Sequence, residues 1–255
     1  MPGTIRIDIN SDVGESYGAF RQGADDELFP LISSANVACG FHGGDPRTME
    51  RTVRALANLG VAIGAHPSYP DLVGFGRRVI QATPDEIRTD VIYQIGALKG
   101  FCDIAGVPLH HVKPHGALYN LAARDAAVAG AIVAAVHALA PDVAIYAQPG
   151  SVLESSAREA GLQVMREAFA DRAYLANGSL ASRHLPGAVL TDPREVGERV
   201  IRMIRGEAIP TVDGDPIAIE AETICIHSDT PTAVPIAREL RRMLGEAGIA
   251  VETIV

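Results

Sequence analysis

Residues 5–10 read Ile-Arg-Ile-Asp-Ile-Asn, a strict alternation of aliphatic and polar side chains. Alternate residues of a β-strand face opposite sides, so one side of this strand is aliphatic and the other is charged or polar. Two later segments repeat the pattern, VAIGAH at 61–66 and TICIH at 223–227. Strands of an open sheet covered by helices on both faces usually read as continuous apolar runs instead. The alternation therefore favours a closed barrel, with aliphatic residues facing outward under helices and a partly polar interior.

Short aliphatic runs alternate with longer amphipathic ones along the chain, as in parallel sheets with crossover helices. Strands are predicted at 5–10, 34–39, 61–66, 109–113, 143–148, 162–167 and 222–227, with one more at 249–254. Four helices are predicted to begin at a capping residue followed by proline, namely Asp45-Pro46, Thr83-Pro84, Asp192-Pro193 and Thr230-Pro231. No linker or change in composition divides the chain. We therefore expect a single-domain β/α barrel over residues 1–255, TIM-barrel-like, with about seven mostly parallel strands.

Composition excludes several classes of function. The net charge of −9 argues against general affinity for nucleic acid, which depends on neutralising phosphates. No apolar run approaches the roughly 20 residues of a membrane span, and the N-terminus lacks the pattern of a signal peptide. The three cysteines are odd in number and show no CxxC spacing, so a disulfide framework or structural zinc site is not expected. A cytoplasmic protein that binds neither nucleic acid nor membranes is the expectation.

Polar side chains cluster where the predicted strands end. The stretch HVKPHGALYN at 111–120 ends a strand with Lys113 and His115 around Pro114, which suits the end of a strand better than its middle. Other strands lead into Asp12, His42, His66, Glu167 and His227 in the same way. In parallel β/α barrels the carboxyl ends of the strands form the active-site face. We therefore expect one shared cavity there, lined by the inward residues Asp8, Asn10, Asn36, His66, Lys113 and His227.

Each of these residues also has a purely structural interpretation. A histidine at a strand end is often a satisfied hydrogen-bonding group, and Asp45 is most simply a helix cap. Cys39 and Cys225 read as small buried apolar residues. Lys113 is harder to explain structurally, because a buried lysine needs either an ionic partner or a functional role. The structural interpretation is an ion pair with Asp8 or Asp12. The convergence of many polar groups, not any one of them, favours catalysis.

Metal and nucleotide motifs are weak in this sequence. Asp12, His42 and His66 are an acceptable open metal-ligand set, but no HxxxH or HExxH spacing supports it, so no metal site is predicted. The glycine-rich run CGFHGGDP at 39–46 precedes a helix and can present N–H groups to an anion. It is not a Walker A loop, and neither GxxxxGK[ST] nor GxSxG occurs.

Six long motifs resemble the LamB/YcsF family, in unbroken order from about Ile5 to His227. They are IDINSDVGESYG, SSANVACGFHGGDP, GVAIGAHPSYPDLVGFGRR, YQIGAL, HVKPHGALYN and EAFADRAY. Members of that family are described as the A subunit of the bacterial ATP-dependent 5-oxoprolinase. The resemblance implies a seven-stranded barrel of the glycoside hydrolase/deacetylase type. It also implies hydrolysis of 5-oxo-L-proline to L-glutamate, with ATP as co-substrate used mainly at partner subunits B and C.

That chemistry assigns provisional roles to the polar residues. The candidate catalytic residues are Asp12, His42, His66, Lys113, His115 and Glu167, and the candidate substrate-binding residues are Asn10, Asn36, Arg172 and His227. Opening a lactam needs a base for water, a proton donor for the ring nitrogen, and cations for the developing negative charge. Asp12 is the candidate base, His66 or His42 the donor, and Lys113 the electrostatic stabiliser. Two alternatives remain at this stage: a metal-dependent amide or sugar N-deacetylase on the same barrel, and a non-catalytic lactam-binding regulatory module.

Overall fold

The computed structural model describes residues 5–254 and contains a closed parallel β-barrel. Its strands are β1 (Arg6–Val13), β2 (Ser34–Ala38), β3 (Ala62–His66), β4 (Leu109–Val112), β5 (Ala144–Ala147), β6 (Val164–Phe169), β7 (Thr223–His227) and β8 (Ala250–Val251). The order runs from β2 through β7 to β1, and β1 also pairs with β2, which closes a ring of seven strands. The short β8 pairs with the start of β1, outside that ring. The predicted barrel is confirmed and every predicted strand overlaps an observed one, although only Ala250–Val251 of the predicted 249–254 is strand.

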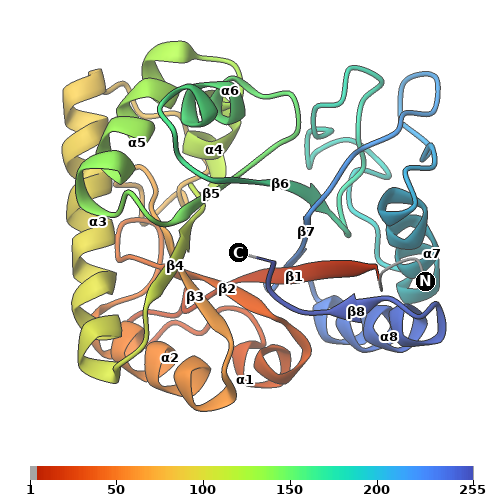
Figure 1. Ribbon diagram of the computed structural model, residues 1–255, viewed down its shortest axis with the longest axis horizontal. Helices are drawn as coiled ribbons and strands as arrows, with labels where there is room; N and C mark the ends of the chain where they lie inside the picture. The colour runs from red at the N-terminus through yellow and green to blue at the C-terminus, as the bar shows by residue number, and fades with distance from the viewer. Residues whose placement is uncertain (1–4, 255) are drawn as a thin grey trace.

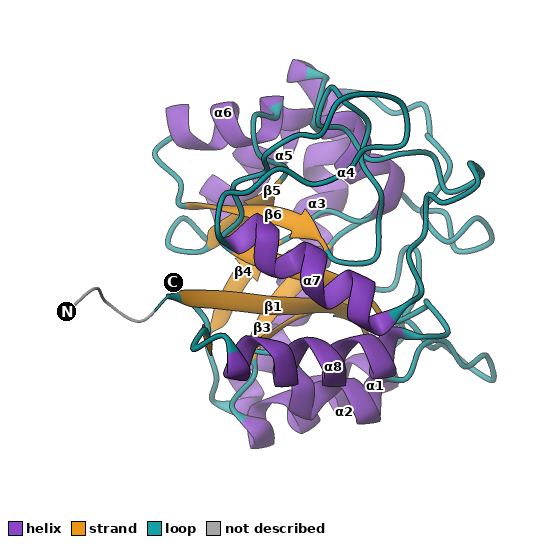
Figure 2. Cartoon of the chain, turned by 90° about the vertical axis from the view of Figure 1, so that its right-hand side faces the viewer, coloured by secondary structure: helices purple, strands orange, loops and turns teal. Residues whose placement is uncertain are grey.

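Helices surround most of the barrel, and loops take their place at the upper right of Figure 1, between α6 and α7. The helices are α1 (Asp25–Leu28), the 3₁₀ turn η1 (Phe29–Leu31), α2 (Pro46–Leu59), α3 (Pro84–Ala105), α4 (Gly116–Ala122), α5 (Ala126–Leu139), α6 (Val152–Glu159), α7 (Pro193–Ile204) and α8 (Ala233–Glu246). Figure 2 shows long loops gathered at the end toward which the arrow of β6 points. Within residues 5–254 no single helix is long and apolar enough to cross a membrane. Only α4 and α5 taken together pass that test, across a bend of 111°.

The predicted helix starts are correct at three of the four Asp/Thr-Pro pairs. Asp45 and Asp192 each accept a hydrogen bond from the third residue of their helix, and Thr83 forms a full capping box with Glu86. The prediction at Thr230-Pro231 is wrong, because α8 begins at Ala233. The hydroxyl of Thr230 is used elsewhere, since it donates to Oδ2 of Asp171 at 2.8 Å.

The alternation in β1 separates the outer core from the barrel interior, as predicted. Ile7 and Ile9 are buried in the large apolar core that the helices complete. Asp8 is also fully buried, but it faces inward and accepts hydrogen bonds from Ser34, Tyr146 and Thr223. The interior is therefore filled by polar side chains that satisfy one another, which is what burial of polar groups requires.

Gly64 in β3 leaves room for one of these interior side chains. A β-carbon at position 64 would overlap the imidazole of His111, whose ring stacks on Tyr146 at 3.9 Å. We expect Gly64→Ala to destabilise the protein by about 3 kcal/mol or more, because a rigid polar layer cannot make room. Gly96→Ala, inside α3 with its nearest neighbour at 3.8 Å, is the matched control and should be neutral or stabilising. Chemical denaturation measures both, and equal effects would contradict the packing argument.

Candidate active site

A cavity of about 660 Å³ opens at the carboxyl ends of the strands. Asp12, His66, Lys113, His115, Arg172 and His227 are the predicted site residues that line it. His42 and Glu167 are buried directly behind this lining, where His42 stacks on His115 and Glu167 pairs with Lys113. The strand ends therefore bring eight of the ten candidates together, as the parallel barrel predicts.

Asn10 and Asn36 lie below the cavity and are fully buried. Asn36 donates through Nδ2 to Oδ1 of Asn10 at 2.7 Å and to Oδ1 of Asp12 at 2.8 Å. Its own Oδ1 lies 2.7 Å from Nε2 of His111. Asp8 sits lower still, so the expected lining by Asp8, Asn10 and Asn36 is not observed. Layers of side chains fill the barrel interior, and the amide of Asn36, which also bonds Asn10, holds Asp12 in place from beneath.

Lys113 is the central cation of the site. Its ammonium lies 2.8 Å from Oδ1 of Asp12, 2.8 Å from Oε1 of Glu167 and 3.1 Å from Sγ of Cys225. Burial lowers the pKa of Lys113, but the charges of Asp12 and Glu167 outweigh burial and hold that pKa well above its usual value. Lys113 is therefore charged, and it pairs with Asp12 and Glu167, not with Asp8. Cys225, expected to be a plain apolar residue, is part of this cluster.

Asp12 is held as a carboxylate at the edge of the cavity. Burial raises its pKa, but His66 and Lys113 outweigh burial, and the pKa lies well below the ordinary aspartate value. Oδ1 of Asp12 also lies 3.3 Å from Nε2 of His66. The other ring nitrogen of His66 donates to the carbonyl of Lys113 at 2.6 Å, so Nε2 is the nitrogen that faces Asp12 and the cavity.

His227 and Asp171 form a buried pair that the sequence did not single out. Nδ1 of His227 lies 2.8 Å from Oδ1 of Asp171, which is fully buried. Burial raises the pKa of Asp171, but its charge interaction and hydrogen bond with His227 lower it below the usual value. A carboxylate that accepts a hydrogen bond from one ring nitrogen fixes the tautomer and the orientation of the histidine. Because His227 lines the cavity, its other nitrogen, Nε2, is available there. The one sequence signal for Asp171 was its position just after a predicted strand, next to Arg172.

Arginines make the upper wall of the cavity basic. Arg172 donates to the carbonyl of Ala181 at 2.6 Å, while its Nε has no hydrogen-bond acceptor among residues 5–254. Burial and the nearby charge of Arg183 lower the pKa of Arg172 to about 10. Arg77 also lines the cavity and pairs with Asp229 at 2.5 Å. Since Asp12 is the one carboxylate in the described lining, the cavity suits an anionic ligand.

Asp25 gives the site region a predictable pH dependence. Burial raises the pKa of Asp25 to about 6, although its Oδ2 accepts a hydrogen bond from the backbone N–H of Gly14. The folded state therefore binds this proton more tightly than the unfolded state, and stability falls as pH rises from about 4 through 6. We expect Asp25→Asn to raise the free energy of unfolding at pH 8 by on the order of 2 kcal/mol, and hardly at all at pH 4. Denaturation at both pH values tests this, and a pH-independent gain would contradict it.

Comparison with known proteins identifies the family. The model of the LamB/YcsF family matches residues 7–255. The chain belongs to the LamB/YcsF family. The 5-oxoprolinase A subunit of Thermus thermophilus is 52% identical over 247 residues, covering 97% of this chain and 99% of that protein. The 5-oxoprolinase A subunit of Chloroflexus aurantiacus is 53% identical over 248 residues, covering 97% and 98%. The family resemblance inferred from the six motifs is confirmed.

Solved structures support the same fold. The crystal structure of the lactam utilization protein from Thermus thermophilus superposes with a TM-score of 0.93 at 51% identity, covering 98% of this chain and 100% of that chain. The catalytic domain of a peptidoglycan N-acetylglucosamine deacetylase from Eubacterium rectale matches with a TM-score of 0.52 at 12% identity, covering 100% and 90%. That distant likeness shows a shared barrel architecture and nothing about activity.

Proposed function

We propose that this LamB/YcsF-family chain opens the ring of 5-oxo-L-proline to give L-glutamate, as the hydrolytic component of an ATP-dependent 5-oxoprolinase with subunits B and C. Closely similar relatives are named 5-oxoprolinase A subunits, which supports 5-oxoproline as the substrate and the existence of further subunits. The observation that carries the proposal is the cavity, where one carboxylate and several cations surround a space open to a small anionic ligand.

The residues divide into roles that suit a lactam bearing a carboxylate. Arg172, whose buried Nε–H has no acceptor in the part of the chain that the structure describes, binds the substrate carboxylate through paired hydrogen bonds. Lys113 stabilises negative charge at the lactam oxygen and on the phosphate transferred to it. Asp12 receives a proton from the attacking water. The proton for the leaving ring nitrogen comes from His227, which Asp171 orients, in place of the donor His66 or His42 expected from sequence.

ATP use is assigned to the partner subunits. A five-membered lactam is an unstrained amide that water attacks poorly, so phosphate transfer to its oxygen would give a better electrophile. Water would then add to the activated carbon, the C–N bond would break to give γ-glutamyl phosphate, and hydrolysis of this acyl phosphate would release L-glutamate and inorganic phosphate. The sequence contains no Walker A loop and no kinase-type HRD or DFG run to position Mg²⁺ and a γ-phosphate. We therefore expect the isolated chain to hydrolyse ATP no faster than buffer. A phosphate-release assay on homogeneous protein checks this, and robust ATPase activity would overturn the division of labour.

Reconstitution tests the proposed activity as a whole. Glutamate release from 5-oxoproline and ATP is measured with the chain alone, with subunits B and C alone, and with all three. We expect turnover only in the complete mixture. Normal turnover by subunits B and C without this chain would overturn the proposal, as would a complete mixture that binds 5-oxoproline but releases no glutamate.

A further inference from the structure

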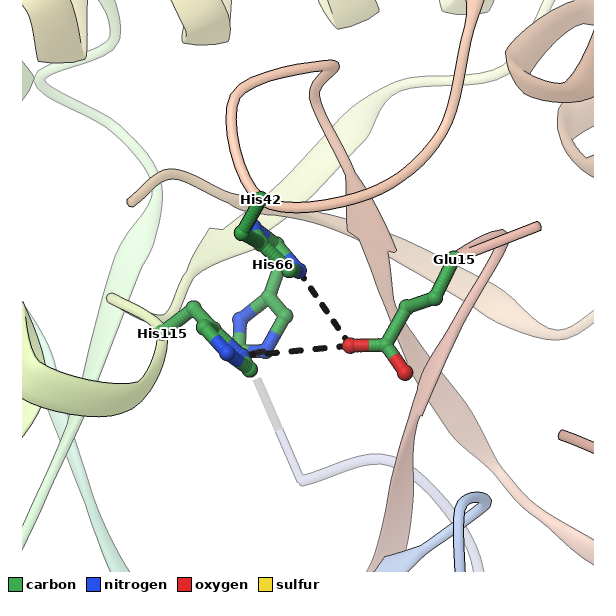
Figure 3. Close-up of side chains that lie close together, drawn as sticks. All are labelled: Glu15, His42, His66 and His115. Carbon is green, nitrogen blue, oxygen red and sulfur yellow. Dashed lines mark hydrogen bonds and ion pairs between the residues drawn. The ribbon is translucent and has the colours of Figure 1, made fainter. Parts of the chain in front are cut away.

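Three histidines and a glutamate meet beside the cavity, each from the end of a different strand. Glu15 follows β1, His42 follows β2, His66 ends β3 and His115 follows β4. Figure 3 shows the four side chains converging, with Glu15 facing His42 and His115. One nitrogen or oxygen of each residue lies within 4.8 Å of the corresponding atoms of the others, and all four residues are buried.

Backbone contacts decide which nitrogen atoms face the centre of this cluster. Nδ1 of His66 donates to the carbonyl of Lys113 at 2.6 Å, and Nε2 of His115 donates to the carbonyl of Phe75 at 2.8 Å. The remaining nitrogen atoms, Nε2 of His66 and Nδ1 of His115, carry lone pairs in the neutral rings. They face each other at 3.0 Å. Two lone pairs at this distance repel unless a cation or a proton lies between them.

The spacing of these atoms suits a metal ion. Bonds of about 2.0–2.1 Å at tetrahedral angles place neighbouring ligand atoms about 3.3 Å apart. Here His66 and His115 are 3.0 Å apart, and Oε1 of Glu15 lies 3.8 Å from Nδ1 of His115. Metal-binding histidines almost always donate their other N–H to a carbonyl or carboxylate, as both of these do.

We propose that Nε2 of His66, Nδ1 of His115 and a carboxylate oxygen of Glu15 bind a divalent transition-metal ion, for which zinc is the best match. Imidazole and carboxylate are ligands that zinc accepts, and three protein ligands leave a fourth position open. His66 and His115 both line the cavity, so that position is directed toward it.

His42 is placed to support Glu15 instead of binding the ion. Its ring stacks on that of His115 at 3.8 Å with an angle of 2° between the planes, so an ion in the plane of one ring lies outside the plane of the other. Nε2 of His42 lies 3.2 Å from Oε1 of Glu15 and can hold this carboxylate in position.

A proton on Nε2 of His66 is the competing explanation, because that nitrogen also lies 3.3 Å from Oδ1 of the Asp12 carboxylate, and the Zn²⁺ titration distinguishes the two. His66 is 1% exposed and His115 is 5% exposed, so charging either ring would cost desolvation free energy. A divalent ion shares that burial but forms bonds to three ligands, with the carboxylates of Glu15 and Asp12 nearby to offset its charge. The four residues come from the ends of four different strands, so no local spacing motif in the sequence predicts the site.

Metal binding to the purified chain tests the proposal without any substrate. The protein is stripped with a chelator, dialysed, and titrated with Zn²⁺ by calorimetry, and elemental analysis gives the stoichiometry. We expect one equivalent to bind, and affinity to fall by about 100-fold or more in Glu15→Gln, His66→Gln and His115→Gln. His184→Gln is the matched control, because His184 lines the same cavity outside the cluster and should leave affinity unchanged.

Zinc-edge anomalous scattering from a crystal of the loaded wild-type chain provides a test that needs no variant to fold. A peak about 2.0–2.2 Å from the three named atoms is expected. Absence of Zn²⁺ binding by the wild-type chain, unchanged affinity in all three variants, or an anomalous peak elsewhere would each overturn the site. These measurements do not involve 5-oxoproline, so their failure is distinguishable from failure of the proposed hydrolysis.

Discussion

Replacing Asp12 with asparagine is expected to lower the rate of glutamate formation by about 10²- to 10⁴-fold in the reconstituted enzyme, the usual contribution of a general acid or base. Asparagine keeps the shape and can still accept from Asn36 and Lys113, but it cannot take a proton from water. Because Lys113 retains Glu167 as a partner, the fold should persist. Single-turnover kinetics with circular dichroism on the same samples separates lost chemistry from lost structure.

Asp8→Asn is the matched control for that experiment. Asp8 lies on the same strand and faces the same interior, but it is fully buried below the cavity. Its carboxylate accepts hydrogen bonds from barrel residues, namely Ser33, Ser34, Tyr146 and Thr223. We expect this variant to change stability while turnover per folded molecule stays within a few-fold of wild type. A normal rate in Asp12→Asn, or equal losses in both variants, would remove Asp12 from the chemistry.

Period-two alternation was enough to predict the barrel and the end at which the site lies. Once Ile7 and Ile9 face outward, Asp8 and Asn10 must face inward. Parallel strands also bring their carboxyl ends to one face, so Asp12, Lys113 and His227 had to meet there. These conclusions need only the direction of each strand and the parity of its residues.

The depth and pairing of side chains could not be predicted in the same way, because they depend on register between strands. Asp12 lies beside Asn36 on one strand and His227 on the other, a relation that no single segment encodes. Asn10 and Asn36 were expected at the substrate for this reason, although they lie one layer beneath it. Asp171 and Glu15 follow predicted strands, but no role was predicted for them, because their histidine partners lie 56 and 27 residues away in sequence.

The Lys113→Met variant is expected to lose both activity and stability. Methionine preserves much of the packing of the stem but leaves Asp12 and Glu167 as buried carboxylates without their shared cation. Removing one member of a buried ion pair costs about 3–5 kcal/mol. Loss of the charge facing the lactam oxygen should in addition reduce turnover by about 10²-fold or more. Denaturant unfolding and turnover per folded molecule, measured on the same preparation, report the two effects.

A second substitution separates these two consequences of removing Lys113. In Lys113→Met/Glu167→Gln one of the uncompensated carboxylates becomes a neutral amide, so we expect part of the lost stability to return. The amide oxygen also remains an acceptor for the hydroxyl of Tyr119, which donates to Glu167 at 2.7 Å in the wild-type chain. Activity should not return, because the cation near the reacting oxygen is still missing. Recovery of turnover together with stability would show that Lys113 serves only to balance buried charge, and it would leave the stabilisation of the oxyanion to Arg172 or Arg77.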